Sequence, residues 1–342
     1  MSRMLIVGGA LLAAAVHAPA SQAQPAESFY SNKQISLVVG YNPGGTYDLY
    51  SRFAATWLPR YIPGNPKIIV KNMPGAGGAK AANFLYQQGS KDGLTIGMIS
   101  QASALQQVIQ DPAVEYDVRK FTWLGRITPI VEVTAVWHTS PVKTIQDAMK
   151  RETVLGATAA GATSQIMPNV MNQIVGTKFK TTKGYPGTTG AMLAMERGEV
   201  EGSHATAENL VIGKPDWLRD KKISVLVQYA QDRHPAFPDV PTMTEFGTTD
   251  QDKQILALFG STAEIGRSLV APPGVPEDKL DVLRKAFASM VNDPAFKEEL
   301  EKRNMEFGPL SGEELQKRVA QTVEVPQDVA KRAIALQGTS GE

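Results

Sequence analysis

A short apolar run, a glycine loop and a helical segment follow one another early in the chain, and this order restricts it to an α/β arrangement. The run "ISLVV" (35–39) is rich in β-branched residues and predicts a buried strand. After "YNPGGTYD" (41–48), apolar residues recur every four positions at Leu49, Phe53 and Trp57, which indicates one helix face. The first amides of such a helix can donate hydrogen bonds to an anion. A tight connection that binds nothing is the alternative interpretation.

The first 23 residues have the features of a secretory signal peptide. Arg3 precedes an apolar core that runs from Leu5 to Val16, and the small residues Ser21 and Ala23 follow it. This pattern predicts export and cleavage after Ala23. The apolar core is too short for a membrane anchor, which is the alternative. No cysteine follows the core, so nothing indicates a lipidated N-terminus.

Charge and composition exclude several classes of protein. Loss of Arg3 with the leader reduces the 35 basic residues to 34, which balance the 34 acidic residues, so neither nucleic acid nor a membrane surface is an expected partner. The chain contains no cysteine, so the fold must rely on apolar burial. A chain of this length can bury enough apolar surface for two domains, and no later apolar run approaches the roughly 20 residues of a spanning helix.

Strands and helical segments continue to alternate along the chain, which predicts parallel βαβ units. In the first part, "KIIVKN" (67–72) and "LTIGMIS" (94–100) flank a second glycine loop and a helix. Strands of a second sheet are predicted at 131–137, 153–158, 178–182, 199–205 and 223–230. A last strand, "RSLVA" (267–271), precedes a C-terminal part that is expected to be mostly helical.

Nucleotide and cofactor motifs are weak in this sequence. Gly75 and Gly77 follow a predicted strand and precede a helix, but Lys80 stands where a dinucleotide fingerprint has its third small residue. Export also separates the protein from the nicotinamide pool, and no Walker A motif occurs. No cofactor is therefore expected.

Metal and catalytic motifs are equally weak. The histidines of the mature chain, His138, His204 and His234, are scattered, so no metal site is expected. His204, at a predicted strand end near candidate loops, is interpreted as a satisfied surface histidine, and contact with a ligand is the alternative. No G-x-S-x-G elbow is present, and an exported hydrolase built around Ser164 or Ser203 is kept only as an alternative.

Four glycine-rich loops at strand ends carry the clearest functional signal. "YNPGGTYD" and "NMPGAGG" lie in the first half, "AAGATSQ" and "GYPGTTG" lie in the second, and each precedes a helix. Thr163 or Ser164 is predicted to cap one of these helices, and Thr188 or Thr189 another. Helix starts that converge on a cleft can bind an anion through backbone amides and hydroxyls without arginine.

The order of these segments resembles the substrate-binding receptors of tripartite tricarboxylate transporters, also called the Bug family of periplasmic solute-binding proteins. The similarity runs from about residue 33 to about residue 325. It is carried by "YNPGGTYD", "NMPGAGG", "KDGLTIGMIS", "GYPGTTGAMLAMERGEVEG", "RHPAFPDVPTMTEFG" and "RSLVAPPGVPEDKLDVLRKAF".

The resemblance implies a two-lobed α/β periplasmic binding protein of type II, a Venus flytrap in which each lobe is a mainly parallel sheet flanked by helices. It implies a first lobe of residues 26–130 and 256–342 and a second lobe of residues 131–255. The protein would be a monomer that captures a small organic carboxylate in the periplasm, performs no chemistry, and delivers the ligand to integral membrane subunits of a tripartite transporter. A periplasmic sensor for a signalling kinase is a further alternative.

The resemblance also implies a ligand site between the lobes. The first lobe would contribute Asn42, Pro43, Gly44, Gly45, Thr46, Tyr47, Asp48, Gly75, Ala76, Gly77 and Gln101. The second lobe would contribute Gly161, Ala162, Thr163, Ser164, Tyr185, Gly187, Thr188 and Thr189. Asp48 would either contact the ligand or satisfy the helix N-terminus. Tyr41 is expected to pack, and a Tyr47 that faces the cleft would favour a longer or aromatic acid.

Overall fold

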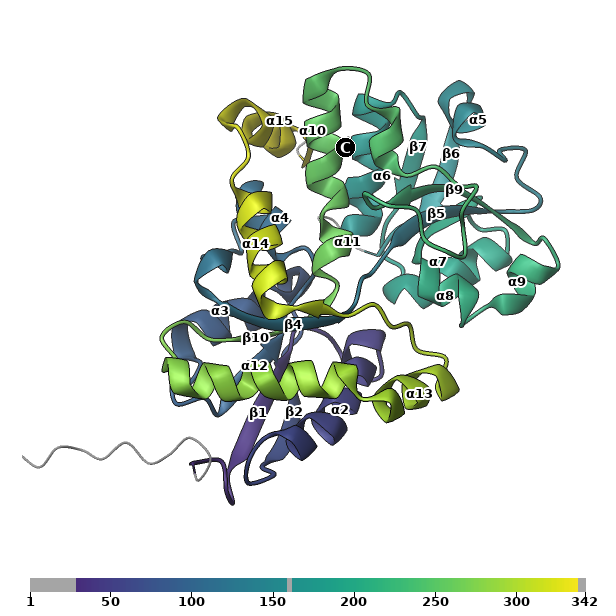
Figure 1. The fold of residues 1–342 in the computed structure, drawn as a ribbon. Helices are drawn as coiled ribbons and strands as arrows, with labels where there is room; N and C mark the ends of the chain where they lie inside the picture. Colours follow the sequence, from purple (N-terminus) through teal and green to yellow (C-terminus); the bar gives the residue numbers. More distant parts are fainter. Residues whose placement is uncertain (1–28, 159–161, 338–342) are drawn as a thin grey trace, which may run out of the picture.

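The computed structural model describes residues 29–158 and 162–337 of the chain. Two β-sheets lie side by side, and helices flank each of them (Figure 1). We call each sheet with the helices that cover it a lobe. The expected two-lobed α/β architecture is confirmed, and the predicted leader, residues 1–23, lies outside the described residues.

Six strands form the sheet of the first lobe, in the order β11-β4-β10-β3-β1-β2. Their bounds are Gln34–Val39 (β1), Lys67–Asn72 (β2), Thr95–Met98 (β3), Thr122–Thr128 (β4), Arg267–Ala271 (β10) and Leu310–Ser311 (β11). β1 pairs in parallel with β2 and β3, whereas β10 runs antiparallel to β3 and β4. β11 pairs with β4 at the edge of the sheet.

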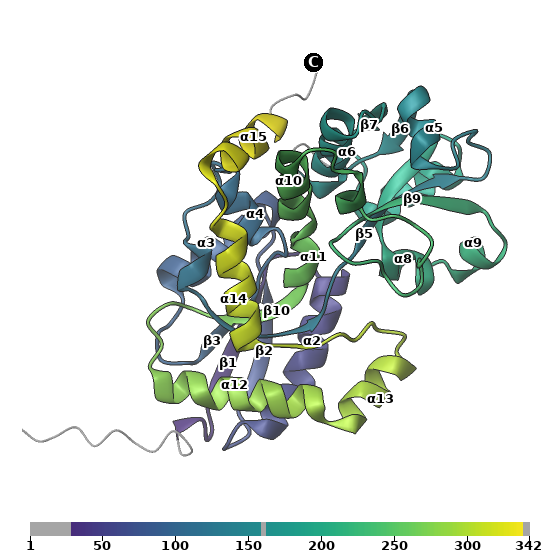
Figure 2. The ribbon, with the colours of Figure 1, turned by 45° about the horizontal axis from the view of Figure 1, so that its top comes forward.

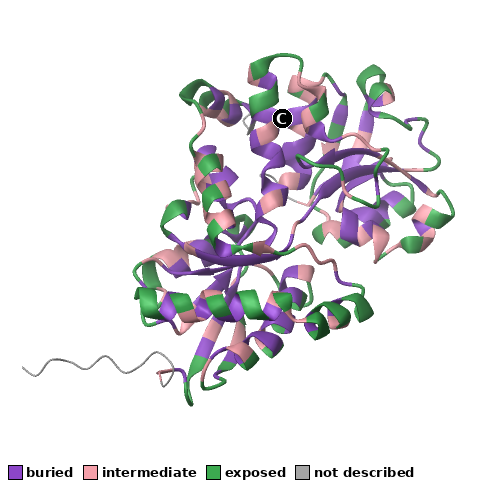
Figure 3. Ribbon diagram, viewed as in Figure 1, coloured by how far each residue is buried: buried purple, intermediate pink, exposed green. Residues whose placement is uncertain are grey.

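Helices cover both faces of the first sheet because β1 is apolar on both sides. Leu37 and Val39 pack in one cluster with α2 and α12, while Val38 packs in another with α3 and α14. Figure 3 shows α12 with buried residues on one side and exposed residues on the other. The helices of this lobe are α2 (Thr46–Trp57), α3 (Ala79–Gln88), α4 (Ser103–Val108), α12 (Glu277–Asn292), α13 (Pro294–Lys302) and α14 (Gly312–Val323), with short 3₁₀ turns η1 (Leu58–Tyr61), η2 (Ala76–Gly78) and η3 (Val118–Lys120).

Five strands form the sheet of the second lobe, in the order β7-β6-β8-β5-β9. They are β5 (Glu132–Trp137), β6 (Thr153–Gly156), β7 (Phe179–Thr182), β8 (Gly202–Thr206) and β9 (Ile223–Tyr229). The helical segments between and after them are α5 (Ile145–Lys150), α6 (Thr163–Ile174), α7 (Gly187–Glu196), α8 (Ala207–Val211), α9 (Pro215–Arg219), η4 (Met243–Phe246), α10 (Asp250–Gly260) and α11 (Thr262–Ile265). Here too the two faces of β5 pack in different clusters, through Val136 and Val133.

The expectation of mainly parallel sheets is wrong, because both sheets are mixed. β6 pairs in parallel with β7 and β8, but β5 is antiparallel to β8 and β9. The cause lies in the connections between the lobes. The chain leaves the first sheet through β4 and returns to it through β10, and it enters the second sheet through β5 and leaves through β9. A strand that enters a sheet from the lobe boundary runs opposite to one that leaves toward it.

Two connections between the lobes lie next to each other. Residues 129–131 join β4 to β5, and α11 leads back into β10. The Ile130 amide donates a hydrogen bond to the Ala263 carbonyl at 3.1 Å, which ties the two connections together. Between α11 and β10, Gly266 has φ 51° and ψ −141°, a backbone conformation that side-chain-bearing residues avoid.

The C-terminal helices contact both lobes. α14 packs on β4 and α4, while α15 (Gln327–Gln337) packs on α6 and α10. Val329, Ala333 and Leu336 of α15 are buried in the cluster that also holds Met167 of α6 and Leu256 of α10. Figure 2 shows α14 beside the first lobe and α15 beyond it, next to α10. Only residues 324–326 separate the two helices.

Candidate functional site

The topology places the glycine loops on facing edges of the two sheets. β1, β2, β3 and β4 all run in one direction, because β1 is parallel to β2 and β3, and both β3 and β4 are antiparallel to β10. β4 ends at the lobe boundary, where the chain crosses to β5. Because β1, β2 and β3 run in the same direction as β4, their carboxyl ends and the loops that follow them also lie at this boundary. In the second sheet, β5 starts at the lobe boundary, and β6, β7 and β8 run in the opposite direction. The carboxyl ends of these three strands, and the loops that follow them, therefore lie at the same boundary. Ligands of α/β proteins commonly bind at such carboxyl edges.

The helices that follow these loops begin without side-chain caps. The residues before α2, α3, α6 and α7 are Gly45, Gly78, Ala162 and Pro186, and none of them caps its helix through a side chain. By contrast, α10, α13 and α14 begin with Thr249, Asp293 and Ser311, whose side chains accept hydrogen bonds from first-turn amides. The loop helices therefore keep amide donors available at the lobe boundary.

The predicted caps at Thr163 or Ser164 and at Thr188 or Thr189 are wrong. These residues lie inside the first turns of α6 and α7 rather than before them, so their hydroxyls cannot reach the first-turn amides in the manner of a cap. The Thr163 hydroxyl instead donates to Glu132 Oε1 at 2.7 Å. Ser164 Oγ accepts from the Thr158 amide at 3.1 Å and so fastens the start of α6 to the end of β6.

Asp48 holds the first glycine loop in place. Its Oδ2 accepts from the Gly44 amide at 3.0 Å and from Arg52 Nε at 2.8 Å, and its Oδ1 accepts from Asn72 Nδ2 at 2.9 Å. The hydrogen bond from Arg52, followed by those from Gly44 and Asn72, lowers the pKa of Asp48 to about 2. Both oxygens therefore have protein donors. This is the structural role that the sequence left open, and ligand contact by Asp48 remains a prediction.

The substitution Asp48→Asn is expected to lower the free energy of unfolding at neutral pH by about 1–2 kcal/mol, because hydrogen bonds to a charged acceptor are lost. The pKa of Asp48 is depressed in the folded state, so its contribution exists above about pH 4 and disappears as the pH falls toward 2. Urea unfolding from pH 7 to pH 2.5 should therefore show a smaller acid loss in the variant. Asp281→Asn, at an exposed site on α12, is the control. Equal pH profiles for Asp48→Asn and wild type would contradict this role.

Two stacked tyrosines close the first-lobe side of the boundary. The rings of Tyr41 and Tyr47 lie 4.1 Å apart between centroids, and Tyr41 packs on the core of the lobe as expected. The Tyr47 hydroxyl accepts from the Gln101 amide at 3.0 Å, and the Tyr41 hydroxyl is hydrogen-bonded to Ser100 Oγ at 2.8 Å. Gln101 is buried, and its Oε1 has no hydrogen-bond partner among the described residues. Whether Tyr47 selects longer acids remains a prediction.

The second-lobe side contains Glu132, which no sequence pattern indicated, and His204, for which ligand contact was the alternative to a surface position. Glu132 and His204 are both buried, and His204 Nε2 lies 3.3 Å from Glu132 Oε1. The His204 ring stacks on Tyr229, with centroids 5.3 Å apart. The interpretation of His204 as a surface histidine is therefore wrong: the antiparallel pairing of β8 with β5 places it opposite Thr134 in the middle of the sheet. The only signal for Glu132 was a charge at the start of an otherwise apolar strand.

A buried ion pair joins the two lobes beside these groups. Arg267 Nη2, from β10, donates to Glu208 Oε2, from α8, at 2.5 Å. The Tyr50 hydroxyl donates to Glu208 Oε1 at 3.0 Å, and the Arg267 guanidinium lies 4.3 Å from the centre of the Tyr50 ring. Burial raises the pKa of Glu208, although Arg267 opposes this shift. No sequence pattern indicated a role for these three residues, since their partners lie far along the chain.

The remaining predicted site residues differ in exposure. Asn42, Pro43, Gly44, Gly45, Gly75, Ala76, Gly77, Gly187 and Thr189 are exposed, whereas Thr46, Ala162, Tyr185 and Thr188 are partly buried. Tyr185 packs against the second-lobe core. Gly161 lies outside the described residues. The described part of the site thus consists of exposed loops around a buried polar floor.

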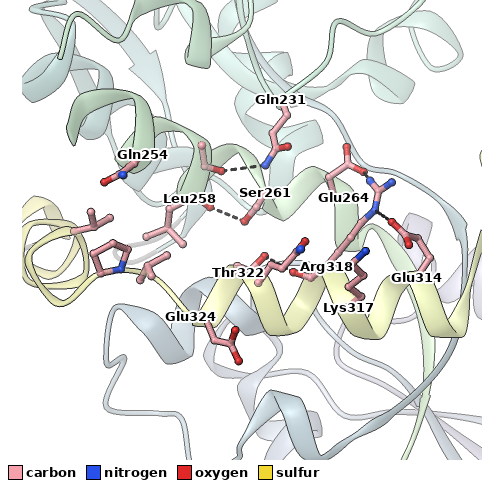
Figure 4. A pocket seen from close by; sticks show the side chains of 15 residues that line it. Gln231, Gln254, Leu258, Ser261, Glu264, Glu314, Lys317, Arg318, Thr322 and Glu324 are labelled. Carbon is pink, nitrogen blue, oxygen red and sulfur yellow. Dashed lines mark hydrogen bonds and ion pairs between the residues drawn. The ribbon is translucent and has the colours of Figure 1, made fainter. Parts of the chain in front are cut away.

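A cavity of about 560 Å³ lies away from these loops, between α10, α11 and α14 (Figure 4). None of the predicted ligand residues lines it. Glu264 lies on its wall and is paired with two arginines: Arg318 Nη1 donates to Glu264 Oε2 at 2.5 Å, and Arg126 Nη1 does so at 3.2 Å. A second hollow of about 490 Å³ along α3 includes Ala76 but no other predicted residue. The cavities therefore give no reason to move the site.

The serines proposed for a hydrolase are engaged elsewhere. Ser164 is hydrogen-bonded to Thr158, and Ser203 Oγ donates to the backbone carbonyl of His204 at 3.0 Å, not to its ring. Within residues 29–158 and 162–337, no three acidic or histidine side chains gather in a way that could hold a metal ion. No helix in these ranges is long and apolar enough to cross a membrane.

Comparison with known sequences gives one family and distant relatives. A family model described as "Tripartite tricarboxylate transporter family receptor" matches residues 62–334. A curated relative, the "UPF0065 protein in gbd 5'region" of Cupriavidus necator, is 25% identical over 345 residues, which cover 97% of this chain and 98% of the relative.

Two solved structures share the fold. Rpa4515 of R. palustris, determined with adipate, has a TM-score of 0.66 at 21% identity, over 88% of this chain and 97% of that chain. MatC of Rhodopseudomonas palustris, determined with bound malate, has a TM-score of 0.61 at 20% identity, over 87% of this chain and 99% of that chain. At these identities the likeness concerns the fold.

Proposed function

The chain belongs to the tripartite tricarboxylate transporter receptor family, and from this premise we propose that it captures a small organic carboxylate in the periplasm and passes it to the integral membrane subunits of such a transporter. The observation that carries the proposal is the set of uncapped helix starts of α2, α3, α6 and α7 on facing sheet edges. Adipate and malate in the two structural relatives support a carboxylate as the ligand class.

The recognition mechanism rests on backbone donors. The first-turn amides of α2 and α6 would hold the acid group from both lobes, because an uncapped helix N-terminus carries free N–H groups and partial positive charge. The predicted loop residues from Asn42 to Asp48 and from Ala162 to Ser164 would contribute those of their amides that have no partner in the protein, whereas the Gly44 amide and the Thr163 hydroxyl already donate to Asp48 and Glu132. Ligand binding would favour the state in which the lobes are closed on it, since only that state brings both sets of donors together.

Several finer features belong to the same proposal. The protein acts as a monomer, performs no catalysis, and loses its leader after Ala23 before it folds in the periplasm. The lobe limits are those that the family resemblance implies, residues 26–130 with 256–342 and residues 131–255, except that α10, α11 and α15 pack with the second lobe. The positions of Ser164 and Ser203 support a binding role over hydrolysis, because neither hydroxyl is hydrogen-bonded to a histidine ring among the described residues.

A thermal-shift screen of residues 24–342 tests the function. Mono-, di- and tricarboxylates, aromatic acids, amino acids and their neutral amides are compared. A ligand that binds only the folded state stabilises it by about 2.7 kcal/mol at a hundredfold excess over its dissociation constant, so the cognate acids should raise the melting temperature. The matched amides should not. No shift with any acid, or equal shifts with the amides, would contradict the proposed function.

A further inference from the structure

Glu132 presents a buried acceptor that the protein does not satisfy. The residue is 8% exposed, and its Oε1 accepts from the Thr163 hydroxyl at 2.7 Å. Its Oε2 is buried and has no hydrogen-bond partner among the described residues. Buried polar atoms in folded proteins almost always have a partner, because an unmet one is costly. Some donor from outside the described chain is therefore expected at Oε2.

Glu132 lies where the two sets of glycine loops meet. It is the first residue of β5, and its partner Thr163 begins α6, in the loop predicted to bind ligand from the second lobe. On the other side lies the Tyr41–Tyr47 pair of the first lobe. Burial raises the pKa of Tyr41 to about 12, and the charge of Glu132 contributes to this rise, which places the carboxylate within electrostatic reach of the first-lobe loop.

The protein groups around Glu132 leave Oε2 open. His204 Nε2 is near Oε1, at 3.3 Å, but without hydrogen-bond geometry, and its Nδ1 is also without a partner among the described residues. The other buried charges of this region, Arg267 and Glu208, are paired with each other through Arg267 Nη2, while Arg267 Nε and Nη1 have no hydrogen-bond partner among the described residues. A buried carboxylate repels a second carboxylate and attracts a hydrogen-bond donor, most strongly a cationic one.

We propose that the ligand is an organic acid that also carries a hydrogen-bond donor, a hydroxyl or an ammonium group, and that Glu132 Oε2 accepts a hydrogen bond from this donor. The inference rests on the proposed function and narrows its ligand class. The carboxylate of the ligand accepts hydrogen bonds from the helix amides, and the hydroxyl or ammonium group of the ligand donates a hydrogen bond to Glu132. Glu132 is then a specificity-determining residue, since an acid without the donor leaves Oε2 buried and unpaired.

Titration calorimetry on the mature protein tests the inference with three series of equal chain length: propionate, lactate and alanine; succinate, malate and aspartate; glutarate, 2-hydroxyglutarate and glutamate. In at least one series, an acid with a donor should bind about tenfold or more tightly than the unsubstituted acid, because the hydrogen bond involves a charged acceptor. Glu132→Leu should abolish that preference. Glu132→Gln keeps an uncharged acceptor, so it should retain much of a preference for hydroxyl but lose most of a preference for ammonium.

The outcomes separate the inference from the function. If unsubstituted acids bind as tightly as their substituted partners, or if the preference survives Glu132→Leu, the inference is overturned while the receptor function stands, and ordered water is the partner of Oε2. If no acid of any series binds the wild type, the inference is overturned, whereas the carboxylate function fails only if the wider thermal-shift screen is negative as well. Glu196→Gln, on the partly exposed end of α7, is the matched control and should leave all affinities unchanged. The wild-type series decides the question even if a Glu132 variant folds poorly.

Discussion

Replacing Arg267 by methionine is expected to lower the free energy of unfolding by about 3–5 kcal/mol. The Arg267 side chain is 1% exposed, and its guanidinium neutralises Glu208 and lies over the ring of Tyr50. Methionine fills much of the same volume but leaves the Glu208 carboxylate buried without its counter-ion. Breaking one half of a buried ion pair costs far more than losing an exposed pair, since the remaining charge cannot reach water.

Urea unfolding of four proteins checks this expectation: wild type, Arg267→Met, Glu208→Gln and the double variant. The double variant should be less destabilised than the sum of the single variants, because it leaves no unpaired charge. The loss in Arg267→Met should also shrink as the pH falls, since the pKa of Glu208 is already raised by burial and a protonated Glu208 needs no counter-ion. Arg219→Met removes an exposed pair with Asp220 and should cost less than about 1 kcal/mol. Equal losses for Arg267→Met and Arg219→Met would refute the role given to Arg267.

Replacing Gly266 by alanine is expected to destabilise the protein by about 3 kcal/mol or more. A Cβ at this position would lie 2.2 Å from the carbonyl oxygen of Thr128 and 2.8 Å from Cα of Pro129. Both atoms belong to backbone and cannot turn aside as a flexible side chain would. The positive φ of Gly266 adds a conformational cost of about 1–3 kcal/mol for any side-chain-bearing residue. The contact also lies at the crossing between the lobes, so the variant should alter ligand affinity along with stability.

Gly176→Ala provides the control for this variant. Gly176 also has a positive φ, 83°, but nothing lies within 4 Å of the position that a Cβ would take. Its substitution should therefore cost only the backbone term, about 1 kcal/mol. Chemical unfolding of both variants separates the steric part of the effect from the conformational part. If Gly266→Ala cost no more than Gly176→Ala, the close approach of the two crossings would be disproved.

Most strands were predicted from the sequence, because the apolar pattern that marks a strand lies within the segment itself. β2 and β10 occupy the predicted segments, residues 67–72 and 267–271. β4 was missed, because Gly125 and Arg126 interrupt its apolar run. In the structure, the ring of Phe287 fills the space that a Cβ at Gly125 would take, 2.0 Å from Phe287 Cε1, and Arg126 is paired with Glu264. Those partners are far along the chain, so no local pattern contains them.

The candidate site also contains a part that the sequence predicted and a part that it did not. The glycine loops and helix starts were predicted, since each is a stretch of consecutive residues with a defined backbone role. The polar floor was not predicted: Glu132 meets Thr163 only after β5 and α6 pack together in the second lobe, and Glu208 meets Arg267 only after the two lobes face each other. The predicted caps failed by one to three positions, because a threonine or serine before a helix and one inside its first turn look alike in a sequence. Side-chain contacts between residues far apart in the sequence depend on the whole fold and not on any one segment.

The C-terminal helices make the chain cross between the lobes three times, at residues 129–131, at α11 and at 324–326. A lobe that is connected to the other at only two neighbouring points can rotate about the line that joins them. α15, seated on α6 and α10 while α14 stays on β4, supplies an attachment away from that line. Residues 324–326 therefore form a third connection, which is expected to restrict this rotation. We therefore expect residues 324–326, far along the sequence from every glycine loop, to limit how far the two lobes can separate.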